Sequence, residues 1–244
     1  MAAALKIMII FDFDWTLIDD ESDRWLISNT GLSQKFNELH LQLPWPSLMD
    51  RLMEELHLRG KTVDEIRECL KQVSIHPRIV AAIRSAHALG CDLKVLSDAN
   101  QFNIETVLKN HGLYDCFSEI ITNPAVIENE GRIRILTYQD PASLHGCNLC
   151  PPNLCKGLVV KRMQSLSLRD GNTRFIYLGD GEGDFCPTSK LNKEDRVMPR
   201  KDFALMDLIL KDPSLVKAQV HGWSNGEELE RILLELINKI SNVN

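Results

Sequence analysis

Residues 9–16 read Ile-Ile-Phe-Asp-Phe-Asp-Trp-Thr and close an apolar run that begins at Leu5. Such a continuous run is typical of a central parallel strand that is buried on both faces of a sheet. Two carboxylates, Asp12 and Asp14, follow it directly, and like charges placed so close repel each other. The stretch therefore predicts a buried strand that delivers charged side chains to one edge of a sheet.

Two similar apolar runs, over residues 92–97 and 174–179, lie further along the chain. Helical patterns flank them: residues 77–90 have proline at a suitable first helical position and glycine just past the end, and residues 155–168 form a second pattern. Strands that alternate with helices predict an α/β fold with a doubly wound, Rossmann-like parallel sheet. In such sheets, ligands bind beyond the carboxyl ends of the strands.

The segment between the first two strands has no apolar run typical of a strand. Leucine and methionine recur at helical spacing from Leu48 to Leu56, and residues 62–65 have the pattern of a capping box. We therefore expect a small helical cap inserted into the core. The expected division is 20–75 for the cap, with 1–19 and 76–244 for the core.

Composition limits the classes of partner. The chain has 244 residues and a formal net charge of −6, without the clustered lysine and arginine of a nucleic-acid-binding surface. No apolar run approaches the ~20 residues of a membrane span, and the first residues do not form a signal peptide. Seven cysteines without a secretory signal predict reduced thiols and a cytoplasmic protein. None of these features indicates an oligomeric state.

Polar residues follow each of the three predicted strands. Parallel strands bring their carboxyl ends to one edge, so four carboxylates are expected to share a small volume there: Asp12, Asp14, Asp180 and Asp184. Mg²⁺ would offset their repulsion, because it binds a few carboxylate oxygens together with water and phosphate. Lys156, the Ser97 hydroxyl and the glycine-rich backbone that begins at Gly181 would supply charge and donors for a phosphate.

In this order, the strand-end motifs resemble those of haloacid dehalogenase superfamily phosphatases. The four motifs are Asp12-Phe-Asp14-Trp-Thr16, Leu96-Ser97-Asp98, Cys155-Lys156-Gly157 and Gly179-Asp180-Gly-Glu-Gly-Asp184. Further stretches are similar to the phosphoethanolamine/phosphocholine phosphatase group, above all to its plant branch, which includes thiamine monophosphate phosphatase. They include Asp19-Asp-Glu-Ser-Asp23-Arg-Trp25, Leu43-Pro-Trp45, Cys147-Asn-Leu-Cys150 and Val197-Met-Pro-Arg200. The similarity runs over nearly the whole chain.

The resemblance implies a magnesium-dependent phosphatase. Asp12 would attack phosphorus and form an aspartyl-phosphate, and Asp14 would protonate the leaving alcohol and then activate water. The resemblance places Mg²⁺ on Asp12, the backbone carbonyl of Asp14 and Asp180, with Asp184 in support. The expected phosphoryl ligands are Thr16, Ser97 and Lys156.

The resemblance also implies that Asp23 and Asp98 recognise a cationic leaving group, because a carboxylate attracts ammonium or thiazolium in a shielded pocket. Asp23 could instead cap a helix, and Asp98 could order the turn at Ser97. Trp25 and Trp45 could add cation–π contacts, although a place in the core is the preferred interpretation.

The expected substrate is a small phosphate ester, with thiamine monophosphate first and phosphocholine or phosphoethanolamine next. Pyridoxal phosphate and pyrophosphate are further options. A phosphomutase uses the same aspartate pair, and a non-catalytic phosphometabolite-binding protein is the remaining alternative.

A cysteine-rich stretch precedes Lys156. His145, Cys147, Cys150 and Cys155 could form a closed Zn²⁺ site. However, the spacing is compressed and only one Cys-x₂-Cys pair is present, so a structural cysteine-rich turn is the preferred interpretation.

Trp15 departs from the resemblance, because related phosphatases commonly carry lysine, arginine or glycine at that place. We expect its side chain to face the cap or a core helix.

Overall fold

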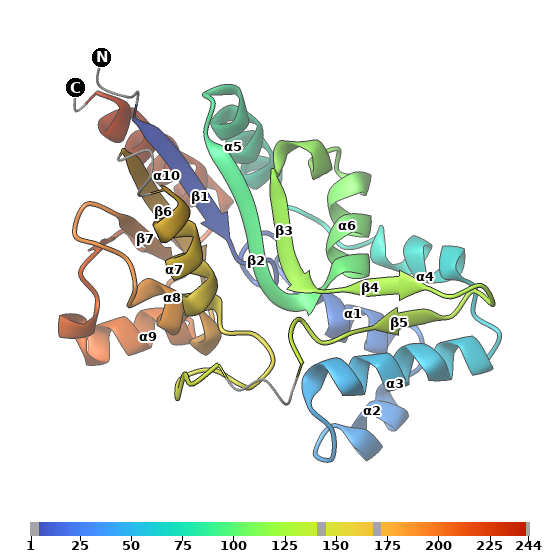
Figure 1. Ribbon diagram of the computed structural model, residues 1–244. Coiled ribbons are helices and arrows are strands. Elements are labelled where there is room, and N and C mark those ends of the chain that lie inside the picture. The colour runs from blue at the N-terminus through green and yellow to red at the C-terminus, as the bar shows by residue number, and fades with distance from the viewer. Residues whose placement is uncertain (1–4, 141–144, 168–171, 243–244) are drawn as a thin grey trace.

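The computed structural model describes residues 5–140, 145–167 and 172–242. Six parallel strands form one sheet in the order β3-β2-β1-β6-β7-β8 (Figure 1). The three central strands are β1 (Lys6–Phe11), β2 (Asp92–Asn100) and β6 (Thr173–Gly179). They coincide with the three apolar runs, so the prediction of a Rossmann-like α/β sheet is confirmed. The outer strands are β3 (Glu119–Asn123), β7 (Arg196–Pro199) and β8 (Gln219–Val220).

The register of the central strands aligns their carboxyl ends. Phe11 at the end of β1 pairs with Val95 of β2 and with Leu178 of β6. The backbone N–H of Asp12 then donates to the Leu178 carbonyl at 2.9 Å. The motif residues that follow β1, β2 and β6 are therefore brought to one edge of the sheet.

Both faces of β1 are covered by helices. Ile9 and Phe11 belong to one buried cluster, which includes side chains of α5 (Pro77–Ala88), α6 (Gln101–Asn110) and α10 (Gly226–Ser241). Ile10 belongs to the opposite cluster, which includes side chains of α7 (Lys156–Ser167) and α9 (Ala204–Lys211). This two-sided burial explains why the strand reads as a continuous apolar run.

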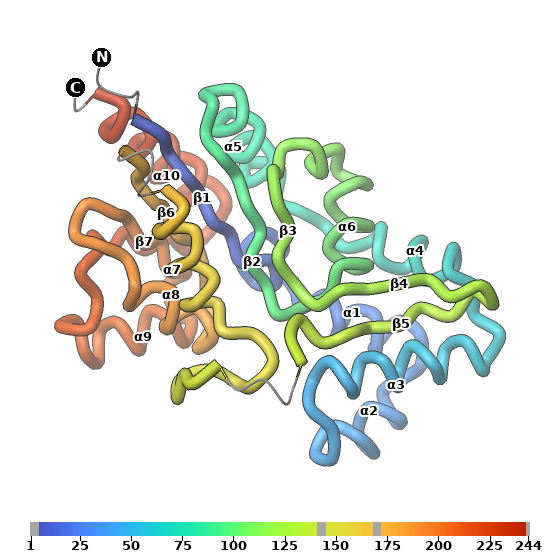
Figure 2. Tube along the Cα trace, in the orientation of Figure 1, coloured from blue at the N-terminus to red at the C-terminus, as the bar shows by residue number. Residues whose placement is uncertain are grey.

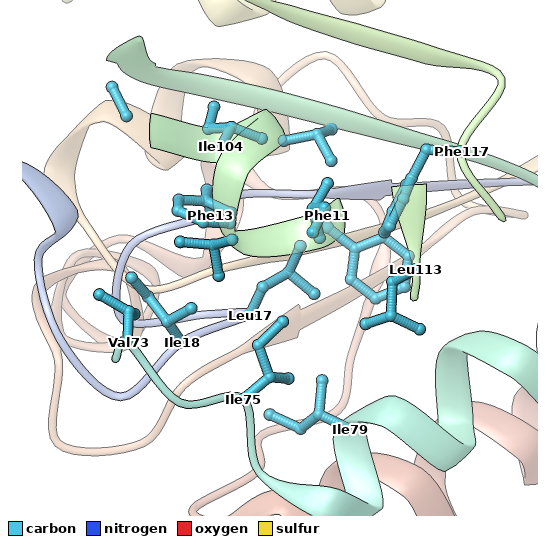
Figure 3. Close-up of a cluster of buried hydrophobic side chains, with 14 of the residues drawn as sticks. Phe11, Phe13, Leu17, Ile18, Val73, Ile75, Ile79, Ile104, Leu113 and Phe117 are labelled. Atoms are coloured by element: carbon cyan, nitrogen blue, oxygen red, sulfur yellow. The ribbon is translucent and has the colours of Figure 1, made fainter. Parts of the chain in front are cut away.

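The first cluster extends beneath the loop that carries the Asp12-Phe-Asp14-Trp-Thr16 motif. Phe13, Leu17 and Ile18 are buried, and they pack beside Phe11 and Val73 (Figure 3). Burial of each such side chain stabilises the fold by about 1.5–3 kcal/mol. Apolar residues thus anchor the loop from below, while the polar residues between them are left for the site.

Four helices follow the first motif: α1 (Ser22–Asn29), α2 (Ser33–Leu39), α3 (Trp45–Leu58) and α4 (Val63–Leu70). They lie within the range expected for the cap, whose bounds remain a prediction. A hairpin of β4 (Ala125–Ile127) and β5 (Ile133–Ile135) runs on from the end of β3 as a separate two-stranded sheet and packs against α3 (Figure 2). Asp50 of α3 accepts hydrogen bonds from Arg134 Nε at 2.9 Å and from the Ile135 amide at 3.0 Å. The hairpin was not predicted.

Local signals mark the helix boundaries. Thr62 and Glu65 form the expected capping box at the start of α4, and Pro77 opens α5. The remaining short helices are η1 (Tyr114–Cys116), η2 (Glu182–Asp184), α8 (Phe185–Thr188) and η3 (Pro213–Leu215). Within the described ranges, every helix is too short or too polar to cross a lipid bilayer.

Candidate active site

Three buried aspartates meet at the carboxyl edge of the sheet. Each of Asp12, Asp180 and Asp184 offers a carboxylate oxygen, and these oxygens all lie within 4.8 Å of one another. Lys156 Nζ lies between two of these side chains, 3.0 Å from Asp12 Oδ1 and 2.9 Å from Asp184 Oδ1. Residues that follow β1 and β6, together with the first residue of α7, therefore form a single charged cluster, which we call the carboxylate cluster.

The carboxylate cluster has more acidic than basic groups. With all three carboxylates ionised and Lys156 protonated, two negative charges are left without a positive partner. Burial raises the pKa of Asp12 well above its usual value, and the Asp184 carboxylate raises it further. Burial and Asp184 likewise raise the pKa of Asp180 to about 7. A divalent cation would restore neutrality, and a set of oxygen donors suits Mg²⁺.

Asp184 is buried, and both of its carboxylate oxygens accept hydrogen bonds from neighbouring residues. Its Oδ2 accepts hydrogen bonds from the amides of Asp180 and Gly181, both at 3.1 Å, and its Oδ1 accepts one from the Tyr177 hydroxyl at 2.6 Å. A Cβ at Gly179 would lie 2.5 Å from Asp184 Cγ, so only glycine allows this approach. The Gly181 amide, predicted to bind substrate, is used to hold Asp184. Tyr177 was missed because it lies within an apolar strand.

Lys156 opens α7 and stays cationic in this setting. Burial alone lowers the pKa of its ammonium group, but the carboxylates of Asp12 and Asp184 outweigh burial and raise the pKa above its usual value. Lys156 also lines the cavity beside the cluster, so it can meet a phosphate there.

Asp14 lies outside the carboxylate cluster but lines the same cavity, which has a volume of about 380 Å³. The Ser22 amide donates to Asp14 Oδ1 at 2.8 Å and fixes the carboxyl group. Burial raises the pKa of Asp14 well above its usual value, and the nearby Asp23 adds to the effect. A raised pKa favours the protonated form that a general acid needs.

The two predicted hydroxyl ligands are fully buried. Thr16 Oγ1 donates to Asp180 Oδ1 at 3.3 Å, so it supports a carboxylate of the cluster. Ser97 Oγ accepts from the Ala99 amide at 3.3 Å and shapes the turn after β2. That these hydroxyls hold phosphoryl oxygens remains a prediction.

Asp23 and Asp98 have different surroundings. Asp23 is buried and accepts hydrogen bonds from Trp45 Nε1 at 2.8 Å, Asn100 Nδ2 at 2.9 Å and Asn103 Nδ2 at 2.7 Å. Burial raises its pKa to about 7, and these bonds tie α1 to α3 and α6. Asp98 is exposed and lines the cavity beside the carboxylate cluster. Of the two aspartates, Asp98 is the one placed to meet a ligand.

A second, mostly apolar cavity of about 320 Å³ adjoins the first. Its walls include Pro44, Pro46, Pro151, Pro152 and Leu154, and we call it the proline cavity. The two cavities share Trp45, Asp98, Lys156 and Gly183.

Trp45 is therefore both a partner of Asp23 and a wall of the site. Trp25 instead donates to the Cys69 carbonyl at 3.1 Å and packs against the core. A place in the core was the preferred interpretation of this tryptophan.

Comparison with known proteins decides the family. Residues 7–237 match the model of the family described as "Putative Phosphatase". The chain belongs to this family of haloacid dehalogenase-type phosphatases. It is 52% identical over 238 residues to the Arabidopsis thaliana thiamine phosphate phosphatase-like protein, covering 97% of each chain. It is 50% identical over 242 residues to Arabidopsis thaliana inorganic pyrophosphatase 2, covering 98% of this chain and 87% of that protein.

Solved structures agree on the fold. A haloacid dehalogenase family hydrolase from Salmonella enterica superposes with a TM-score of 0.61 at 16% identity. The match covers 96% of the present chain and 72% of the hydrolase. The phosphatase thus has the haloacid dehalogenase fold.

An arginine to which the sequence analysis gave no role holds the loop that follows β1. Arg200, directly after β7, donates to the Trp15 carbonyl and to Asp19 Oδ1, both at 2.6 Å. Trp15 adopts a positive φ of 55°, and its ring lies 5.8 Å from that of Phe203. Trp15 therefore packs beside the start of α9, a core helix. The sequence could have indicated a role for Arg200, because this residue directly follows a strand, as the other site residues do.

The zinc ligand set containing His145, which was the less favoured alternative to a structural cysteine-rich turn, is not assembled. Both ring nitrogens of His145 contact the backbone: Nε2 lies 2.8 Å from the Pro151 carbonyl oxygen, and Nδ1 lies 3.1 Å from the Cys147 amide. His145 therefore shapes the loop and is not directed at the cysteines. Cys147, Cys150 and Cys155 do converge, but with Cys186, which lies beyond the stretch considered.

Proposed function

We propose that the phosphatase hydrolyses the phosphate ester of a cationic, ring-containing alcohol, with thiamine monophosphate as the first candidate. The proline cavity carries this proposal. It offers apolar walls for a ring system, the Trp45 indole and the exposed Asp98 carboxylate, directly beside Lys156. A cationic ring would find apolar contact, a cation–π partner and an opposite charge there. The relative that is 52% identical is named a thiamine phosphate phosphatase-like protein, which supports the same substrate.

The proposed chemistry begins at Asp12. Its Oδ1 accepts from the Phe13 amide at 2.7 Å and pairs with Lys156, so Oδ2 is the oxygen to attack phosphorus. The bond from phosphorus to the alcohol oxygen breaks as the new bond to Asp12 forms, and Asp14 gives its proton to the departing oxygen. Asp14 then takes a proton from the water that attacks the aspartyl-phosphate, and inorganic phosphate leaves.

The ionised form of Asp12 needs positive charge nearby, because burial raises its pKa. Lys156 supplies one charge. Mg²⁺ held by Asp12 and Asp180, with Asp184 in support, would offset the remaining negative charge of the cluster and of the substrate.

Pyrophosphate is the second candidate, because a relative that is 50% identical is named an inorganic pyrophosphatase. Its second phosphate group would lie beside Asp98 and the apolar walls of the proline cavity, which offer it no attraction. Phosphocholine and phosphoethanolamine carry a suitable charge but fill less of the cavity, and pyridoxal phosphate supplies a ring.

The test is a comparison of kcat/KM across these esters, because specificity is a ratio of such values. We expect thiamine monophosphate to exceed both pyrophosphate and p-nitrophenyl phosphate by at least about tenfold. Equal kcat/KM values for thiamine monophosphate and p-nitrophenyl phosphate would reject thiamine monophosphate as the preferred substrate. Absence of magnesium-dependent hydrolysis of every ester would instead favour the non-catalytic binding protein.

A further inference from the structure

Four cysteine thiols converge beside the active site, although they come from two separate parts of the chain. Cys147 and Cys150 lie in the loop before α7, Cys155 immediately precedes that helix, and Cys186 lies in α8. Their four Sγ atoms all lie within 4.8 Å of one another, and none of the four cysteines forms a disulfide. Helices α7 and α8 lie side by side, and the loop runs into α7 from below (Figure 2).

The sulfur separations fit a tetrahedral metal site. A Zn–S distance of about 2.3 Å places the sulfur atoms of a tetrahedron about 3.8 Å apart. Cys186 Sγ lies 3.6 Å from Cys147 Sγ and 3.8 Å from Cys155 Sγ. Two packed thiols would also lie in contact, but packing alone does not require four sulfurs to converge on one point.

The backbone is shaped to let Cys186 reach this point. A Cβ at Gly157 would lie 2.4 Å from Cys186 Sγ, so the first turn of α7 accepts the sulfur only because residue 157 is glycine. The donor sets of the two clusters also differ: soft thiolates favour zinc, whereas the buried carboxylates favour magnesium.

We propose that Cys147, Cys150, Cys155 and Cys186 together bind one Zn²⁺ ion in a closed, structural site. Four protein ligands complete a tetrahedron, so the ion has no open position for substrate and does not take part in the chemistry. The metal site does not depend on which ester the phosphatase hydrolyses.

The proposed site would position Lys156, which pairs with Asp12, and Asp184, which pairs with Lys156. Cys155 directly precedes Lys156, and Cys186 lies two residues after Asp184. Lys156 and Asp184 form an ion pair with a separation of 2.9 Å. A metal that joins Cys155 to Cys186 would therefore fix both ends of this pair. The ion would also hold Pro151, Pro152 and Leu154, which line the proline cavity.

The metal content of freshly purified protein tests the site. Protein expressed in bacteria and purified under reducing conditions without added zinc should contain about one zinc per chain. Cys186→Ser and Cys147→Ser should each lose it, whereas the control Cys116→Ser, which changes a half-buried thiol outside the cluster, should keep it. Zinc well below one per chain, even after exposure to Zn²⁺, would reject the site, as would zinc that survives Cys186→Ser in folded protein.

Cobalt substitution separates this site from the carboxylate cluster. Co²⁺ in a thiolate tetrahedron gives an ultraviolet charge-transfer band, which oxygen ligands do not give. Asp12→Asn should keep the band and Cys147→Ser should abolish it; a band that survives Cys147→Ser would contradict the assignment.

The positioning role has its own readout. A zinc-selective chelator, with Mg²⁺ in excess, should lower kcat for p-nitrophenyl phosphate by about tenfold or more and should weaken Mg²⁺ binding, because Lys156 and Asp184 support the groups around the magnesium ligands as outer-shell partners do. Added Zn²⁺ should reverse both effects. Unchanged kcat and Mg²⁺ affinity after complete loss of zinc would reject the positioning role, while the zinc content would still decide the site.

Discussion

At the scale of single residues, Asp23 and Asp98 show what separates a structural carboxylate from one that can meet a ligand. Asp23 is surrounded by three donors, whereas Asp98 is exposed at the junction of the two cavities. Both lie near the strand-end motifs in the sequence, so their spacing could not distinguish them. Only the packing of α1 against α3 and α6 does so.

Asp98→Asn should lower kcat/KM for thiamine monophosphate by about three- to tenfold, because it removes an exposed charge whose attraction is worth about 1 kcal/mol. The value for p-nitrophenyl phosphate should change less than about twofold, because its leaving group carries no positive charge. Steady-state kinetics on both esters measure the difference.

Glu182→Gln is the matched control for Asp98→Asn. Glu182 is an exposed carboxylate that lines the first cavity but not the proline cavity. Glu182→Gln should leave unchanged the ratio of kcat/KM for thiamine monophosphate to kcat/KM for p-nitrophenyl phosphate. An equal loss on both esters in Asp98→Asn would remove the case for charge recognition.

Asp14→Asn should separate the two half-reactions. With p-nitrophenyl phosphate, whose leaving group needs no proton, the variant should release about one equivalent of nitrophenol and then stall. Turnover of thiamine monophosphate should fall by about 10²- to 10⁴-fold, because its alcohol must be protonated. Rapid-quench kinetics distinguish this result from a slow but continuous release of nitrophenol, which would place the acid–base group elsewhere.

The pH dependence follows from the raised pKa of Asp14. The protonated form is present at low pH and is lost as pH rises through the raised pKa. The first step with thiamine monophosphate should therefore slow on the alkaline side, whereas the nitrophenol burst should not. Parallel slowing of both steps would show that a different group controls the alkaline side.

At the scale of elements, the long apolar strands and the capped helices were predictable, whereas the short strands were not. β1, β2 and β6 are apolar because both of their faces are covered. β7 and β8 span only Arg196–Pro199 and Gln219–Val220, too short for any periodicity to appear in the sequence. The hairpin of β4 and β5 is held through Asp50, a contact between residues far apart in the chain.

The capping box of α4 gives a test at this scale. Thr62 Oγ1 accepts from the Glu65 amide at 3.2 Å, and Glu65 Oε2 accepts from the Thr62 amide at 2.9 Å. Thr62→Ala should lower the free energy of unfolding by about 1 kcal/mol, and Thr62→Ser should change it by only a few tenths of that amount. Equal urea midpoints for the two variants would show that the box contributes nothing to stability.

At the scale of the whole molecule, the fold gathers negative charge from distant parts of the sequence and leaves it partly uncompensated. Asp12, Asp180 and Asp184 could be predicted to meet because parallel strands align their carboxyl ends. The role of Cys186 could not, because it depends on α8 lying beside α7.

Magnesium should therefore stabilise the whole protein. At about 100 times its Kd, a ligand that binds only the folded state adds about 2.7 kcal/mol to the free energy of unfolding. Removal of Mg²⁺ should abolish activity and lower the Tm, and Mg²⁺ should restore both. Asp180→Asn should lose most of the Mg²⁺-dependent rise in Tm; a full rise in that variant would place the cation elsewhere.

The central claim is that Asp12 carries the phosphoryl group during turnover. Its most direct test uses Asp14→Asn, which should stall after the first step. The variant is mixed with p-nitrophenyl phosphate and Mg²⁺, quenched in acid, digested and analysed by mass spectrometry. We predict one phosphoryl group on the peptide that contains Asp12, and none in Asp12→Asn/Asp14→Asn. A phosphoryl group on another residue, or release of nitrophenol with no phosphorylated peptide, would contradict the account.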